Sequence, residues 1–214
     1  MLQEIINNQN KEFSKFAKSV TIPLAFVFLI WAIHFSQIIF NMPYAHYGIL
    51  PRKLSGFVGI LSAPLIHADF SHLISNTPTL LILSVAVMYF YPTTSLKVLT
   101  IIYLLTGTFV WLFARQVYHI GASGIIYGLL GFLFFSGIFR RDNRSIALAL
   151  LVTFIYGGLI WGILPGVKGI SWESHLFGGI SGIIVSFIFR KEDPYIKYEW
   201  EKEENGEAEK DEFN

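Results

Sequence analysis

Ser123 and His175 are the two side chains of this sequence whose types could perform acyl transfer together. A serine hydroxyl becomes a nucleophile when an adjacent imidazole takes its proton. Ser123 lies in the sequence Gly-Ala-Ser-Gly from Gly121 to Gly124, which lets another backbone approach closely, and it opens an apolar stretch. If that stretch is helical, its free N–H groups and its positive dipole end favour an anion that develops beside Ser123.

His72 and Asn76 form a second polar pair, four residues apart. Residues at this spacing are neighbours on one face of a helix. Both fall in an apolar stretch, and His175 opens another one. Polar and ionisable side chains are costly inside a membrane span, so by default they mark a functional site there.

The composition places these stretches in a membrane. Of 214 residues, 53% are hydrophobic and 14% are charged, whereas about a quarter are charged in a typical soluble domain. The absence of cysteine excludes a disulfide framework, thiolate catalysis and zinc bound by cysteine. Six windows carry no charged side chain: Ser19–Pro51, Phe70–Leu96, Val98–Ala114, Gln116–Phe139, Ser145–Val167 and Ser174–Phe189.

The window lengths predict six transmembrane helices. A helix crosses the hydrocarbon core with about 17–25 residues, which five windows provide; the sixth provides it if the flanking Trp172 and Arg190 reach the interface. The first window exceeds one span, so we expect its helix to end near Phe40 and a long loop to follow, up to about Ile66.

We therefore expect an all-α membrane protein whose six-helix bundle carries a long first extramembrane loop. The predicted parts are an N-terminal segment over 1–18, the helical domain over 19–190 and a disordered acidic tail over 191–214, which holds ten of the 15 acidic residues. With both termini in the cytoplasm, twelve lysines and arginines lie inside and four outside, as the positive-inside rule requires.

This topology brings the polar residues to one depth. The second, fourth and sixth helices all run inward and begin near Ser71, Gly121 and Glu173, so Ser123, His175 and the His72 pair share one shallow level below the outer surface. Gly178 and Gly182 give the sixth helix a smooth stripe, and small residues at such spacing allow close helix contact in lipid. We expect Ser123 Oγ to reach the His175 ring.

These features resemble the rhomboid family of intramembrane serine proteases. The resemblance covers about residues 19–190 and implies a six-transmembrane-helix rhomboid-like bundle. One departure is that the first loop has Pro51-Arg52 where many members have Trp-Arg. The matching residues are Gly121, Ser123, Gly124, Tyr127 and Gly131 in the fourth helix, His175, Gly178 and Gly182 in the sixth, and His67, His72 and Asn76 around the start of the second.

The resemblance implies a Ser-His dyad, and no carboxylate lies in a span where it could orient the imidazole. His175 would act as general base for Ser123, and Tyr127 would fix the imidazole ring. The Ser123 N–H, His72 and Asn76 would hold the oxyanion. The expected partners are the lipid bilayer and single-span membrane proteins, cut near the outer end of their helix, with no cofactor, metal or nucleic acid. A bacterial cytoplasmic membrane suits such a six-span core.

Two other classes stay open. A transporter or channel could relay protons or bind a metal through His72, His175 and Glu173. A rhomboid-like protein without proteolytic activity could bind membrane proteins, although such members usually lack the serine or the histidine. A metalloprotease is disfavoured because His67 and His72 are five residues apart and no His-Glu-x-x-His pattern occurs.

Several further residues are expected near the outer surface. His67, Asp69 and Ser71 are expected to line the mouth of the site. His34 and His119 receive no role. The loop Leu164–Trp172 contains a proline and two glycines, and it is either a lid that lowers Val167 and Ile170 into the site or a simple connector.

Overall fold

The structure is a computed structural model that describes residues 2–166 and 169–195. Helices account for nearly all of the secondary structure in these residues. The α-helices are α1 (Leu2–Ile39), α2 (Gly59–Ser62), α3 (Phe70–Phe90), α4 (Ser95–Phe113), α5 (Ser123–Arg140), α6 (Asn143–Tyr156) and α7 (Trp172–Ile188). The 3₁₀ turns are η1 (Tyr44–Tyr47), η2 (Leu54–Gly56), η3 (Ala63–Leu65) and η4 (Gly157–Ile163).

Five helical segments in the described part of the chain are long and apolar enough to cross a membrane. They are Gln9–Ile39, Phe70–Phe90, Ser95–Phe113, Ser123–Arg140 and Asn143–Ile163. The sixth predicted span corresponds to α7, which is apolar but has only 17 residues. At 1.5 Å per residue it measures about 25 Å, short of the roughly 30 Å hydrocarbon core. That α7 crosses the membrane therefore stays a prediction.

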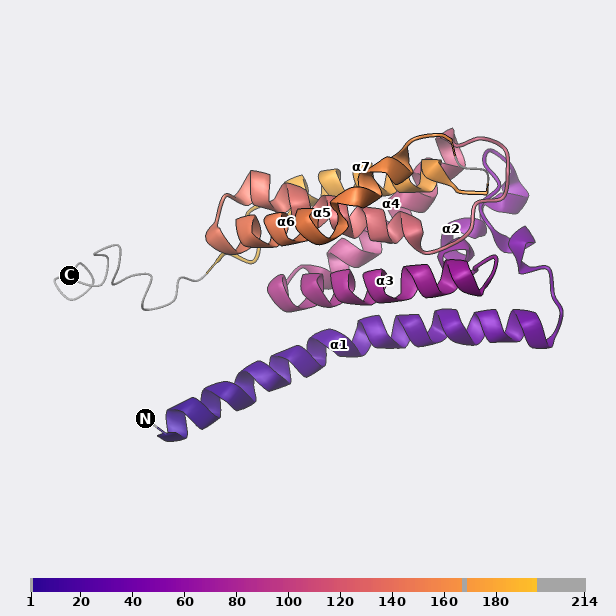
Figure 1. The fold of residues 1–214 in the computed structure, drawn as a ribbon. Coiled ribbons are helices and arrows are strands. Elements are labelled where there is room, and N and C mark those ends of the chain that lie inside the picture. Colours follow the sequence, from indigo (N-terminus) through magenta and orange to yellow (C-terminus); the bar gives the residue numbers. More distant parts are fainter. Residues whose placement is uncertain (1, 167–168, 196–214) are drawn as a thin grey trace.

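The α1 helix is much longer than a bilayer is thick. Its 38 residues extend over about 57 Å, so its first turns project beyond the other helices (Figure 1). Tyr89, at the end of α3, ties this projection to the bundle by donating a hydrogen bond to Glu12 Oε2 (2.5 Å), while Lys15 Nζ lies 4.2 Å from the Tyr89 ring centroid. The start of α1 and the end of α7 lie at the same end of the bundle.

The long first loop is present and is anchored to the far end of α4. Between Ile39 and Phe70 the chain forms only short helical turns. Arg52 Nη1 donates to Ala114 O at 2.7 Å and to Leu112 O at 3.2 Å. A cation on the last carbonyl groups of a helix also opposes the negative end of its dipole, so Arg52 stabilises the junction of the loop with α4.

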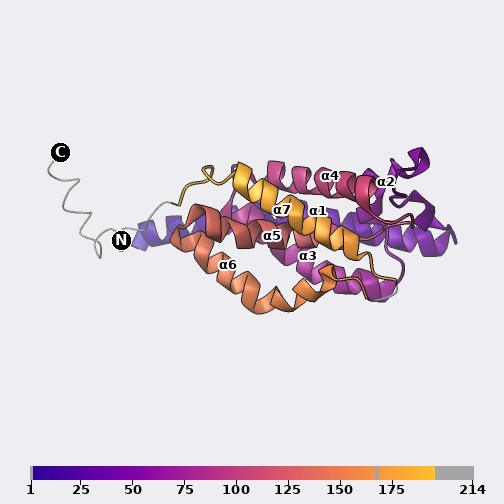
Figure 2. The same ribbon diagram turned by 90° about the horizontal axis from the view of Figure 1, so that it is seen from above.

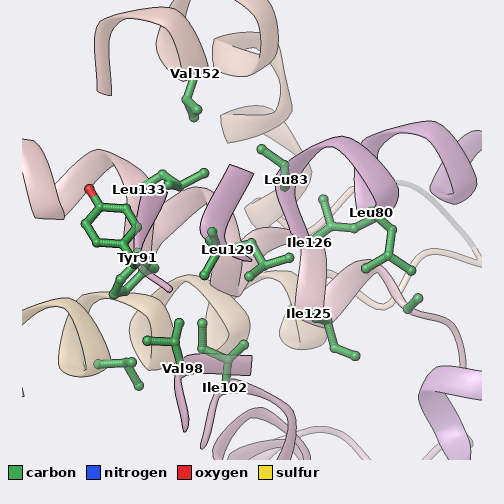
Figure 3. Packing of buried hydrophobic residues seen from close by; sticks show 14 of the residues in the cluster. Leu80, Leu83, Tyr91, Val98, Ile102, Ile125, Ile126, Leu129, Leu133 and Val152 are labelled. Atoms are coloured by element: carbon green, nitrogen blue, oxygen red, sulfur yellow. The ribbon is translucent and has the colours of Figure 1, made fainter. Parts of the chain in front are cut away.

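The core takes buried apolar side chains from α1 and from α3 to α7, and Figure 3 shows the part in which those of α3, α4, α5 and α6 interdigitate. Figure 2 shows α7 between α4 and α5, with α6 at the edge of the bundle beside α5. The labelled part of this cluster comprises Leu80, Leu83, Tyr91, Val98, Ile102, Ile125, Ile126, Leu129, Leu133 and Val152. The buried position of α7 means that its first turn, which carries His175, is held by neighbours on both sides.

The fifth predicted span is only partly α-helical. The α-helix ends at Tyr156 and the chain continues as the 3₁₀ segment η4 up to Ile163. Gly157 and Gly158 lie where the α-helix gives way to the 3₁₀ segment, and glycine has a low propensity for the α-helix because it has no β-carbon. Carbonyl groups of η4 are thereby free to bond outside their own helix.

The chain stays packed beyond residue 190. The Asp193 carboxylate, 9% exposed, accepts hydrogen bonds from Thr93 N (2.8 Å), Thr94 N (3.0 Å) and Thr94 Oγ1 (2.6 Å). Burial raises the pKa of Asp193, but the hydrogen bonds from Thr94 and Thr93 outweigh it, so that the pKa lies below its ordinary value. Within the predicted acidic tail, residues 191–195 are described and Asp193 packs against the start of α4, while residues 196–214 lie outside the described residues.

Candidate active site

The candidate residues come from the first turns of three helices that start at the same end of the bundle, opposite the start of α1 (Figure 1). Ser123 is the first residue of α5, His175 lies in the first turn of α7, and His72 and Asn76 lie in the first two turns of α3. The common depth predicted from the sequence follows from this arrangement.

Ser123 and His175 form the predicted hydrogen bond, with 2.9 Å between Ser123 Oγ and His175 Nε2. The other ring nitrogen, Nδ1, lies 2.8 Å from Gly162 O. A carbonyl oxygen only accepts, so Nδ1 carries the hydrogen in the neutral ring and Nε2 presents its lone pair to the serine hydroxyl. The protein therefore holds the tautomer in which His175 can act as a base toward Ser123.

Tyr127 fixes the plane of this imidazole. The two rings are stacked, with centroids 4.1 Å apart and an interplanar angle of 7°. Tyr127 Oη in turn donates to Leu159 O at 2.7 Å. Both orienting acceptors, at Leu159 and Gly162, belong to η4.

Sequence reasoning missed η4 as part of the site. A β-carbon at Gly162 would lie 2.0 Å from Tyr127 Oη and 3.2 Å from His175 Nδ1, so only glycine fits beside the two rings. The one available signal was the group of three glycines, Gly157, Gly158 and Gly162, within an apolar window. The acceptors themselves are backbone oxygens, which every residue has.

The glycine stripe of α7 lets this helix touch α5. A β-carbon at Gly178 would lie 2.1 Å from Gly124 O, and one at Gly182 would lie 2.1 Å from Gly128 O. Real contacts between such atoms need well over 3 Å. Because the two backbones meet here without side chains between them, Ser123 and His175 can come within hydrogen-bond distance.

His72 packs against Gly121, two residues before Ser123, and Asn76 lies one turn further along α3. The His72 ring fills the space where Gly121 would carry a side chain, with Cε1 2.6 Å from the position of that missing β-carbon. Gly121 also has φ +105°, a conformation that glycine adopts readily. Asn76 is buried, and its Nδ2 has no hydrogen-bond partner in the described part of the chain, which leaves a donor available.

The predicted mouth residues separate in the structure. His67 is fully buried, not at a mouth: its ring packs edge-on against His72, and its Nε2 accepts a long hydrogen bond (3.4 Å) from Ala122 N. Burial, together with the neighbouring His72, lowers the pKa of His67 to about 4. Asp69 and Ser71 are exposed, and Asp69 Oδ1 caps α3 by accepting from His72 N at 2.8 Å.

Of the two residues that the predicted lid would lower into the site, Ile170 is described. Its side chain is 39% exposed. Val167 lies outside the described residues, so the choice between a lid and a connector stays a prediction. Among the described residues, no three histidine or carboxylate side chains gather closely enough to hold a metal ion.

The fold defines a multi-pass integral membrane protein whose polar residues meet at one end of the bundle. A family model described as the Rhomboid domain matches residues 54–192. The match covers more than half of the chain, and the chain therefore belongs to the rhomboid family. The first loop from Leu54 on and all helices from α3 to α7 fall within the matched region.

Similar proteins come from bacteria and a plant. An uncharacterized protein of Mycobacterium bovis is 36% identical over 150 residues, which cover 66% of this chain and 62% of that protein. An uncharacterized protein of Mycobacterium leprae is 33% identical over 150 residues, covering 66% of this chain and 59% of the relative. RHOMBOID-like protein 4 of Arabidopsis thaliana is 29% identical over 152 residues, which cover 69% of this chain and 37% of that protein. The chain thus spans less than two thirds of the length of these relatives.

Proposed function

We propose that this chain is an intramembrane serine endopeptidase that cleaves single-span membrane proteins near the outer end of their transmembrane helix. The observation that carries the proposal is the 2.9 Å contact between Ser123 Oγ and His175 Nε2 at the start of α5, with the imidazole held in the basic tautomer. Membership of the rhomboid family supports the same activity.

In the proposed mechanism, the His175 Nε2 lone pair takes the Ser123 proton while Oγ attacks the carbonyl carbon of the scissile peptide bond. The tetrahedral intermediate collapses as His175 returns the proton to the leaving amine, which gives an acyl-enzyme on Ser123. Water, deprotonated by the same imidazole, then releases the acid product. Gly162 O takes the orienting role that a carboxylate has in a Ser-His-Asp triad, because it accepts from Nδ1.

The developing oxyanion needs hydrogen-bond donors. At the start of α5, Ile125 N and Ile126 N donate to Ala122 O. The N–H groups of Ser123 and Gly124 precede the first acceptors of the helix, and the positive end of the helix dipole favours a negative charge there. His72 and the unpartnered Asn76 Nδ2 supply further side-chain donors from α3. Each such donor contributes about 10²–10³ to the rate in serine proteases.

The substrate class follows from the position of the dyad at the ends of apolar helices. A peptide bond in an intact helix has its carbonyl oxygen hydrogen-bonded and its backbone covered. Such a bond becomes accessible only where the helix unwinds locally. By resemblance to the rhomboid family, we infer that substrates have small residues at the scissile bond and helix-weakening residues below it. The positive-inside rule assigns both termini to the cytoplasm and the dyad to the outer face, and we propose that the membrane is a bacterial cytoplasmic membrane.

The test is labelling and cleavage by the purified chain and its variants. We expect a fluorophosphonate probe to label Ser123, and Ser123→Ala and His175→Ala to abolish cleavage of a single-span reporter in liposomes. Ser186→Ala is the matched control, because this buried hydroxyl bonds only to Ile183 O in its own helix. EDTA should have no effect. Unlabelled, inactive but folded protein would instead support an inactive membrane-protein binder, and activity lost in EDTA would favour a metal-dependent reaction.

A further inference from the structure

His119 joins three segments at the outer end of the bundle. It lies in the connection between α4 and α5 and is 1% exposed. Its backbone exchanges two 2.9 Å hydrogen bonds with Ile49 of the first loop. Its ring contacts Arg115 O through Nε2 (3.0 Å) and Ser171 Oγ through Nδ1 (2.6 Å). Ser171 is the residue that directly precedes α7.

The directions of these hydrogen bonds are determined by the chemistry of the groups. Burial lowers the pKa of His119, so the ring is neutral at physiological pH and carries one hydrogen. Arg115 O only accepts, which places that hydrogen on Nε2 and makes Nδ1 the acceptor. The Ser171 hydroxyl therefore donates to Nδ1, and the Ser174 hydroxyl, 2.6 Å away, donates to Ser171 Oγ. Each hydrogen bond in this series therefore has a defined donor and a defined acceptor.

Arg115 makes a second connection to the start of α7. Its Nη2 donates to Ile170 O at 2.9 Å. Its Nε lies 3.0 Å from Glu173 Oε1, whose side chain is 4% exposed. Neither carboxylate oxygen has hydrogen-bond geometry to a partner, so charge attraction joins this pair. A buried carboxylate is costly without a cation beside it, and the pair therefore favours one position of the first turn of α7.

We propose that Arg115, His119 and Ser171, together with Glu173, act as an outer clasp that positions His175 against Ser123. This inference rests on the proposed protease activity. The clasp reaches His175 through the backbone, because His175 N donates to Ser171 O at 3.4 Å. The chain before Ser171 is rich in glycine and proline, and Ser171 makes no side-chain cap to α7. The clasp therefore holds Ser171 in place at the start of α7.

The experiment compares serine variants in the full chain. Ser171→Ala removes the hydroxyl between His119 and Ser174, whereas Ser171→Thr retains a hydroxyl. Ser181→Ala is the control, because Ser181 is fully buried in α7 and, among the described residues, its hydroxyl bonds only to Phe177 O. For each variant we would measure kcat and KM with a single-span reporter, the rate of fluorophosphonate labelling at Ser123, and Tm.

We expect Ser171→Ala to lower kcat and the labelling rate together by about 10- to 100-fold, as displacement of a catalytic group by about 1 Å does. KM should change little, Ser171→Thr should restore much of the rate, and Ser181→Ala should match the parent. Glu173→Gln, which removes the charge but keeps the shape, should shift kcat and labelling in the same direction, and it serves if Ser171→Ala does not fold.

Two results would overturn the inference while leaving the protease proposal intact. One is an active parent in which Ser171→Ala and Glu173→Gln keep the kcat and labelling rate of Ser181→Ala. The other is a loss confined to Tm or KM, which would assign the clasp a structural or binding role. A folded parent that neither takes the probe nor cleaves the reporter would overturn the protease proposal and this inference together.

Discussion

Replacing Gly178 by alanine should disable the site without touching either member of the dyad. The added β-carbon would lie 2.1 Å from Gly124 O, more than about 1 Å closer than a normal van der Waals contact allows. The atom in the way is backbone of α5, so no side chain can rotate aside and the two helices must separate. Gly178 lies one turn after His175, so the separation acts directly on the 2.9 Å bond to Ser123.

The expected magnitude follows from that displacement. If the helices part by about 1 Å, the Ser123–His175 contact exceeds hydrogen-bond distance, and kcat should fall by about 10²-fold. Overpacking of this kind costs about 1–3 kcal/mol of stability, so the variant should still fold. Gly179→Ala is a demanding control, because a β-carbon at the next residue of the same helix meets nothing within 4 Å.

The assay is cleavage of a single-span reporter in liposomes, with fluorophosphonate labelling and thermal unfolding measured on the same samples. We expect Gly179→Ala to behave as the parent and Gly178→Ala to lose cleavage and labelling while it stays folded. Parent-like kcat in Gly178→Ala would show that α5 and α7 need not be in backbone contact for the dyad to work.

Three further predictions concern other parts of the molecule. His72→Ala and Asn76→Ala should each lower kcat by tens to about a thousandfold, because an oxyanion donor is lost. Fluorophosphonate labelling of Ser123 should be less affected than peptide cleavage. Unchanged kcat in the double variant would remove this pair from the mechanism. Because the pKa of buried His67 is lowered to about 4, the unfolded chain binds more protons between that pH and about 6.5, and stability should therefore fall as the pH falls through this range. Tm measured across these pH values should decline less steeply in His67→Gln, and an equal slope would assign the effect to other groups. Asp193→Ala should lower the free energy of unfolding by about 1–2 kcal/mol with kcat unchanged, because it removes the cap on Thr94 and the start of α4; a kcat loss at unchanged stability would contradict this.

The position of the dyad at one end of the bundle could be predicted from the sequence. Charge-free windows mark spans because a charge in hydrocarbon is costly whatever the fold around it. Ser123 and His175 stand out because each lies near the start of a predicted helix that carries glycines. Helix direction alternates along the chain, so the even-numbered spans had to begin at the same end, and the structure shows the 2.9 Å contact that follows.

The limits of the sequence appear at the helices that differ from the average span. α7 begins with a polar turn in which Glu173 pairs with Arg115, and a count of apolar residues does not describe this junction. His67 was expected at a mouth, yet it is fully buried against His72. Its hydrogen-bond partner Ala122 N lies 55 residues further along the chain, so only packing could determine its exposure.

The tertiary structure alone decided how His175 is oriented. The acceptor of its Nδ1 hydrogen is the backbone oxygen of Gly162, and Tyr127 is held by the backbone oxygen of Leu159. Every residue has a carbonyl oxygen, so neither acceptor leaves a signature in the residue types. The sequence determined which side chains could react, because reactivity belongs to the residue type. The fold determined the tautomer and the angle at which they meet, because these depend on backbone atoms brought together by packing.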